Sequence, residues 1–196
     1  MSRFVDRGAI TAAYVGIGMA VTIAISFLLI IPIGDVALIP FALFSGLLIG
    51  YYANQRSDRR AGPWHRILAN GIFAALVTGL TAAVLLLAVK ALFFYADNGY
   101  RDASAGGPIT CSSGADCVYQ RHRLIEDGGR IAAMEAAGIT DAASFSDFYW
   151  SQQIGTAGLI VALTAIGGLG GAAMYGVFRP KAPTEAAASG QAPRTA

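Results

Sequence analysis

The sequence predicts an all-α integral membrane protein with four transmembrane helices in a bundle and one large extracytoplasmic loop. Two observations predict this fold class. Of the 196 residues, 55% are hydrophobic and only 13% are charged, whereas soluble domains carry about 25% charged residues. In addition, four apolar runs are close to or above the ~20 residues that a helix needs to cross a bilayer. The runs do not alternate apolar with polar residues, so they do not fit transmembrane β-strands.

The first predicted helix covers 8–31 and follows a short N-terminal segment, 1–7. Its apolar run exceeds the roughly 7–15 residues of a signal-peptide core, and no small-residue cleavage site follows it. We therefore expect the helix to be retained. A tight connection leads to the second helix, 36–53, in which Pro40 lies in the first turns, where a missing N–H costs least.

The third predicted helix covers 68–95 and follows a short basic connection, 54–67. The fourth covers 153–178. The segment 179–196 is rich in Ala, Pro and Ser, so it is expected to be a disordered tail.

The loop 96–152, of about 55 residues, is expected to contain short helices and to return to the membrane surface at both ends. One short helix is predicted at about Tyr119–Asp127, and a second is predicted to end at Gly138. Thr140 is the predicted N-cap of the following segment. Aromatic residues near the two ends fit the outer membrane interface: Tyr95, Tyr100, Phe145, Phe148, Tyr149 and Trp150.

The distribution of Lys and Arg predicts the orientation. The segments 1–7, 54–67 and 179–196 hold nine of the 14 Lys and Arg residues but only three of the 12 acidic residues. The positive-inside rule then places both termini in the cytoplasm and the loop 96–152 outside. The predicted location is the cell membrane.

Small residues recur every fourth position in the apolar runs, which keeps them roughly on one helix face. Helices in lipid associate through close backbone approach at such residues. The predicted packing positions are Gly46, Gly50, Gly71, Gly79, Gly167, Gly168, Gly171 and Gly176. They fit packing inside one bundle. The last helix carries two such faces, so a membrane-protein partner or a second copy of the chain is the alternative.

Four arginines of the basic connection are predicted to meet anionic lipid headgroups on the cytoplasmic face: Arg56, Arg59, Arg60 and Arg66. The lipid bilayer is therefore the first expected partner. The net charge is only +2, which gives no electrostatic support for nucleic-acid binding.

Both cysteines of the chain, Cys111 and Cys117, lie in the predicted outer loop. Disulfides persist in extracytoplasmic compartments, and the residues between the two cysteines permit a tight turn. A structural disulfide is the prediction. Two free thiols, a thiol-redox centre and a metal site with His122 are the alternatives.

The topology resembles that of the tetraspanins in its plan of loops and termini, but the Cys-Cys-Gly motif of their large loop is absent. No function is therefore carried over. The sequence predicts no catalytic residue, cofactor or metal site. The expected function is a non-enzymatic accessory or scaffold subunit. A small transporter or channel component is the alternative, and a membrane thiol-redox enzyme is a weaker one.

Overall fold

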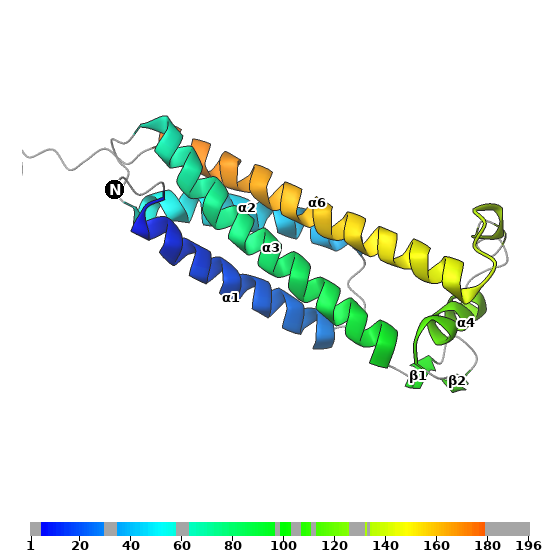
Figure 1. The fold of residues 1–196 in the computed structure, drawn as a ribbon. Helices are drawn as coiled ribbons and strands as arrows, with labels where there is room; N and C mark the ends of the chain where they lie inside the picture. Colours follow the sequence, from blue (N-terminus) through cyan, green and yellow to red (C-terminus); the bar gives the residue numbers. More distant parts are fainter. Residues whose placement is uncertain are drawn as a thin grey trace, which may run out of the picture. The chain divides into compact units, whose positions relative to one another are not determined.

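A computed structural model gives the fold of the 196-residue chain. It describes residues 5–29, 35–57, 63–96, 99–102, 107–110, 113–125, 132 and 134–178. This part of the chain is predominantly helical, as the composition predicts (Figure 1). Three helices in the described part of the chain are long and apolar enough to cross a membrane: Arg7–Ser26, Trp64–Ala96 and Ala142–Val177.

The first three helices follow the predicted apolar runs. They are α1 (Arg7–Leu29), α2 (Asp35–Arg56) and α3 (Trp64–Ala96). Helix α3 begins directly after Pro63, whose carbonyl accepts hydrogen bonds from the N–H groups of Arg66 and Ile67. A proline fits at this boundary because the first N–H groups of a helix have no partner within the helix. Helix α2 contains Pro40 and is not among the three candidate spans.

Helix α6 (Ala142–Val177) is 36 residues long and begins eleven positions before the predicted start at 153. The predicted boundary followed the change from apolar to polar residues. A helix does not end at such a change unless something stops it, and the stretch 142–152 contains neither Gly nor Pro. The aromatic residues from Phe145 to Trp150 are therefore helical and do not belong to a loop.

The predicted outer loop contains a helix and a hairpin. Helix α4 (Ala115–Ile125) begins four residues before the predicted Tyr119. Strands β1 (Gly99–Asp102) and β2 (Gly107–Thr110) pair antiparallel, with Tyr100 opposite Ile109. The sequence prediction included no strand. Four-residue strands are too short for their alternation to stand out from loop composition.

The contacts divide the chain into two compact units. Unit 1 comprises Met1–Gly18, Pro40–Thr78 and Leu163–Ala196, and unit 2 comprises Met19–Ile39 and Gly79–Ala162. Within the described ranges, the buried polar side chains all belong to unit 1: Ser45, Asn54, Asn70, Thr78 and Thr164. The candidate site is therefore built in unit 1.

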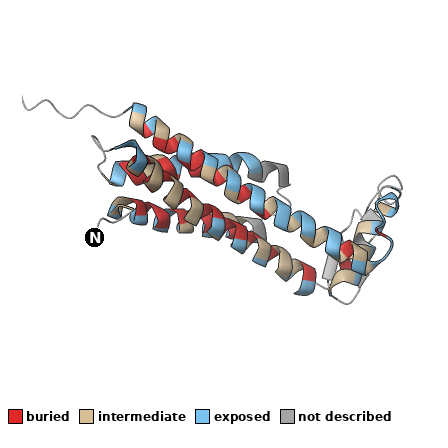
Figure 2. Ribbon diagram, turned by 45° about the horizontal axis from the view of Figure 1, so that its top comes forward, coloured by how far each residue is buried: buried red, intermediate tan, exposed pale blue. Residues whose placement is uncertain are grey.

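The core of unit 1 is made largely of small residues, and many of its large apolar side chains are exposed. Six alanines are completely buried: Ala9, Ala12, Ala53, Ala74, Ala75 and Ala172. In contrast, Phe44 is 60% exposed and Ile166 58% exposed. Figure 2 shows buried and exposed positions on the same long helices. This arrangement is typical of helices that pack closely and turn their bulky apolar side chains to lipid.

Unit 2 has a core of its own at the end of α3. Phe94, Val118, Ile139 and Phe145 are buried together, and they come from α3, α4, the connection to α6 and α6 itself. Phe94 stacks on Tyr149 with a centroid distance of 4.9 Å. The predicted loop segment therefore folds against the end of α3 and the start of α6 within this unit.

Candidate functional site

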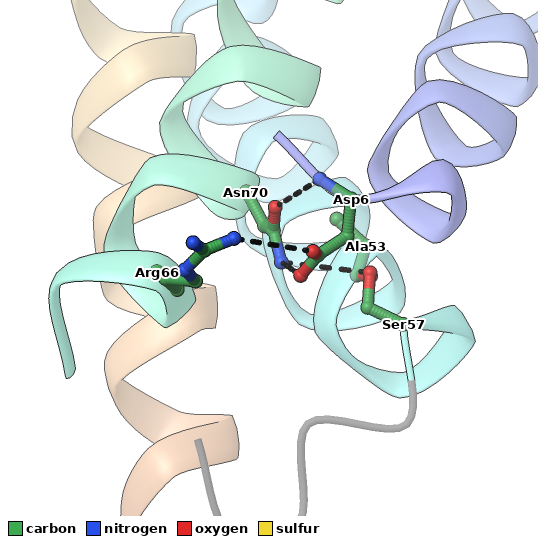
Figure 3. Close-up of polar contacts among 5 residues, drawn as sticks. All are labelled: Asp6, Ala53, Ser57, Arg66 and Asn70. Carbon is green, nitrogen blue, oxygen red and sulfur yellow. Dashed lines mark hydrogen bonds and ion pairs between the residues drawn. The ribbon is translucent and has the colours of Figure 1, made fainter. Parts of the chain in front are cut away.

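The candidate site begins at the start of α1, where Asp6 meets Asn70 of α3. Asn70 is completely buried. Its Nδ2 donates a hydrogen bond to Oδ2 of Asp6 over 2.7 Å, and its Oδ1 accepts one from the backbone N–H of Asp6 over 3.1 Å (Figure 3). The amide group thus acts as donor and acceptor toward the same residue. This two-way contact holds the start of α1 against α3.

Ser57 and Arg66 complete a group that we call the Asp6 cluster (Asp6, Ser57, Arg66 and Asn70). Nδ2 of Asn70 also lies 3.5 Å from Oγ of Ser57, at the end of α2. The Ser57 hydroxyl donates to the carbonyl of Ala53 over 2.7 Å. Nη1 of Arg66 lies 3.9 Å from Oδ1 of Asp6 (Figure 3). The cluster therefore joins α1, α2 and α3 at one end of unit 1.

Asn54 forms a second polar link between α2 and α3, one helical turn from Ser57. Its Nδ2 donates to the carbonyl oxygens of Gly50, at 3.1 Å, and Ile67, at 2.9 Å. The sequence prediction did not include Asn54. A signal was present, because Asn54 continues the four-residue series of Gly46 and Gly50.

The predicted packing glycines of α2 and α6 face each other in a reciprocal pattern. A Cβ added to Gly46 would collide with the carbonyl oxygen of Thr164, and one added to Gly50 would collide with that of Gly168. In the other direction, the carbonyl oxygens of Leu43 and Leu47 lie against Gly167 and Gly171; α2 and α6 therefore run parallel here. Such close backbone approach permits Cα–H···O contacts.

Helix α3 packs against the same stretch of α6 and runs antiparallel to it. A Cβ added to Gly71 would lie 2.6 Å from Cβ of Ala172 and 2.8 Å from the carbonyl oxygen of Gly168. Gly176 lies against the ring of Trp64. Gly79 is also buried, but it belongs to unit 2. The structure thus brings the predicted glycines of unit 1 together within one chain.

The predicted headgroup arginines fall into different environments. Arg56 is exposed at the end of α2. Arg66 is partly buried and faces Asp6, so its charge is shared with a carboxylate. Arg59 and Arg60 lie outside the described residues.

The predicted disulfide cannot be read from the described part of the chain, because Cys111 lies outside it. Cys117 lies in α4 and is completely buried. The disulfide stays a prediction. A thiol assay that tests it must be made on the unfolded chain, because burial protects Cys117 from reagents in either redox state.

The start of α6 carries a polar cap in unit 2. Oδ1 of Asp141 accepts a hydrogen bond of 2.8 Å from the backbone N–H of Ser144. Asp141 is therefore the N-cap, one residue after the predicted Thr140. This backbone hydrogen bond, helped by the Ser144 hydroxyl, lowers the pKa of Asp141 below its ordinary value.

The hydrogen bonds and glycine contacts described above hold neighbouring helices together. Among the described residues no group of three or more His, Cys, Asp and Glu side chains could hold a metal ion. The Asp6 cluster uses its polar atoms to join three helices. Comparisons with protein-family models, with curated proteins and with solved structures give no match.

Proposed function

We propose that the chain crosses the membrane four times, with α2 as a span in addition to α1, α3 and α6. In unit 1, α2 lies parallel to α6 over Leu43–Tyr51, and its contacts with α6 are made backbone to backbone. A helix packed side by side with a membrane-spanning helix in this way lies in the same membrane. Its exposed side chains support the same conclusion, since Phe41 is 58% exposed and Leu48 59% exposed.

The proposed orientation has both termini and the connection 54–67 in the cytoplasm. The charge distribution of the sequence is the main support. The Asp6 cluster adds to it, because the start of α1 is hydrogen-bonded to the start of α3, which in turn contacts the end of α2. The segments 1–7 and 54–67 therefore belong on the same side. Reporter fusions to the two termini test this orientation. Both should be active with a reporter that works only in the cytoplasm, and activity of a reporter that works only outside would contradict the assignment.

We propose that the protein is a non-enzymatic accessory or scaffold subunit of a membrane assembly. The observation that carries this proposal is a second set of glycines on α6. Gly155 and Gly158 have open space where a Cβ would stand, and the neighbouring Ile154 is 62% exposed. Glycines in membrane helices are typical of close helix contacts. Since the described part of the chain leaves the pair uncovered, we assign the pair to a helix of another subunit.

Purification from native membranes in mild detergent tests the proposal. We expect a stoichiometric partner, or a second copy of the chain, to co-purify with the wild type. Gly155→Leu together with Gly158→Leu should remove it, because the added side chains keep a partner helix at a distance. Gly18→Leu is the matched control, since Gly18 is also exposed with open space where a Cβ would stand but has no second glycine one helical turn away.

Two results would contradict the accessory role. One is a wild-type protein that is monomeric and free of partners after mild extraction. The other is ion or solute flux through liposomes that contain the purified chain alone, which would favour a transporter or channel component.

A further inference from the structure

The amide group of Asn54 has a single orientation that satisfies its neighbours. The side chain is completely buried on α2. Its nitrogen lies 3.1 Å from the carbonyl oxygen of Gly50 and 2.9 Å from that of Ile67. Carbonyl oxygens only accept hydrogen bonds, so the NH₂ group must face them. This fixes which amide atom is nitrogen and which is oxygen.

The amide oxygen of Asn54 is consequently a buried acceptor. It has no hydrogen-bond partner within the described part of the chain. Polar atoms as deeply covered as this one nearly always have a partner. The polar side chains of the adjoining Asp6 cluster are engaged elsewhere: the Asn70 amide binds Asp6, and the Ser57 hydroxyl donates to Ala53.

The chemistry of this oxygen restricts what can bind it. The partner must be a hydrogen-bond donor, which excludes a lipid phosphate or another anion. A hard cation needs several oxygen ligands, and the described residues offer no group of three or more His, Cys, Asp and Glu side chains that could hold one. Since protein covers the oxygen, the donor must also be small. Water meets each of these requirements.

We propose that unit 1 binds one internal water molecule at the junction of α2 and α3, where the water donates a hydrogen bond to Oδ1 of Asn54. Asn54 lies one helical turn before Ser57, which directly follows α2, so the water site is next to the Asp6 cluster in the sequence of α2. The end of α2 and the start of α3 then share two neighbouring polar contacts, one in the Asp6 cluster and one at Asn54.

Nuclear magnetic resonance of the full chain in detergent micelles tests this site. The chain contains three asparagines, Asn54, Asn70 and Asn98, so selective ¹⁵N labelling of asparagine gives a simple side-chain spectrum. We would record rotating-frame cross-relaxation from water to the side-chain NH₂ protons. The Asn98→Ser variant removes the signal of Asn98. Of the two remaining side-chain signals, the one that shows cross-relaxation with the Asp6 amide proton belongs to Asn70.

The expected result is a direct water cross-peak at the Asn54 amide and none at Asn70. Asn70 is the matched control because it is equally buried but its oxygen is bonded by the Asp6 N–H. Ser57→Ala serves as the background, since a hydroxyl beside Asn70 exchanges its proton with solvent. The absence of a water peak at Asn54 would overturn the proposal. So would a contact from the Arg66 guanidinium, which would show that a protein donor occupies the oxygen.

Discussion

The side-chain amide of Asn70 donates a 2.7 Å hydrogen bond to the carboxylate of Asp6, a residue 64 positions earlier in the chain. The same amide accepts a hydrogen bond from the Asp6 backbone. One buried side chain on α3 thus holds both the backbone and the carboxylate at the start of α1. A contact of this range fixes helix positions that no local interaction within α1 or α3 can fix.

Asn70→Ala is expected to destabilise the protein by about 1–3 kcal/mol, because it leaves two polar groups of Asp6 without their partner. In a double-mutant cycle with Asp6→Ala, the two changes should be non-additive by roughly 0.5–3 kcal/mol. Unfolding in mixed detergent micelles, followed by the helical circular dichroism signal, measures both quantities. Thr11→Ala is the control, because the Thr11 hydroxyl is exposed and bonds to its own helix. Additive losses would contradict the role assigned to this pair.

Gly50→Ala is expected to separate α2 from α6. The new Cβ would collide with the backbone of Gly168, which cannot move without shifting α6. Overpacking of this kind costs about 1–3 kcal/mol. Gly18→Ala is the matched control, since it adds the same methyl group on a membrane helix where the space is open. The same unfolding assay should show a loss for the first variant and none for the second, whereas equal losses would argue against the contact.

Gly138→Ala is expected to destabilise the connection between α4 and α6 in unit 2. Gly138 has a φ of +80°, in the left-handed region, where an alanine costs about 1–2 kcal/mol. Space is not the reason, because nothing lies within 4 Å of the added Cβ. Gly138→Asn should lose less, since asparagine tolerates this conformation. Amide hydrogen exchange of Ile139, whose N–H bonds to the Met134 carbonyl, measures the effect, and equal exchange in the two variants would contradict it.

The sequence was sufficient for the parts of the fold that depend on composition and spacing. Long apolar runs predicted long apolar helices, and the four-residue series predicted Gly50, Gly71 and Gly168 as packing positions that the structure brings together. The close fit of Gly50 against Gly168 shows why this works: the lack of a side chain at these positions lets two helix backbones approach closely.

The parts of the fold and of the site that the sequence does not predict depend on contacts between residues far apart in the chain. The partnership of Asp6 with Asn70 needs the arrangement of α1 beside α3, which no local pattern contains. Asn54 is the first residue of a polar stretch of sequence, yet it is completely buried, and its amide donates to the carbonyl of Ile67. The change from polar to apolar residues near 153 does not mark the start of α6, because the helix continues through the polar stretch 142–152.

Acidification is expected to weaken the start of α6 through Asp141. Its pKa is lowered in the folded protein, chiefly by the hydrogen bond from the backbone N–H of Ser144. A group with a depressed folded pKa contributes stability above its unfolded pKa, and that stability is lost as the pH falls through the folded pKa. The loss should therefore begin below the ordinary aspartate value of about 4. Hydrogen exchange of the Ser144 amide, corrected for the intrinsic pH dependence of exchange, measures it. Asp141→Asn keeps a capping side chain that does not titrate, so this variant should show no such acid dependence. If both proteins respond equally to acid, the cap of α6 does not depend on the charge of Asp141.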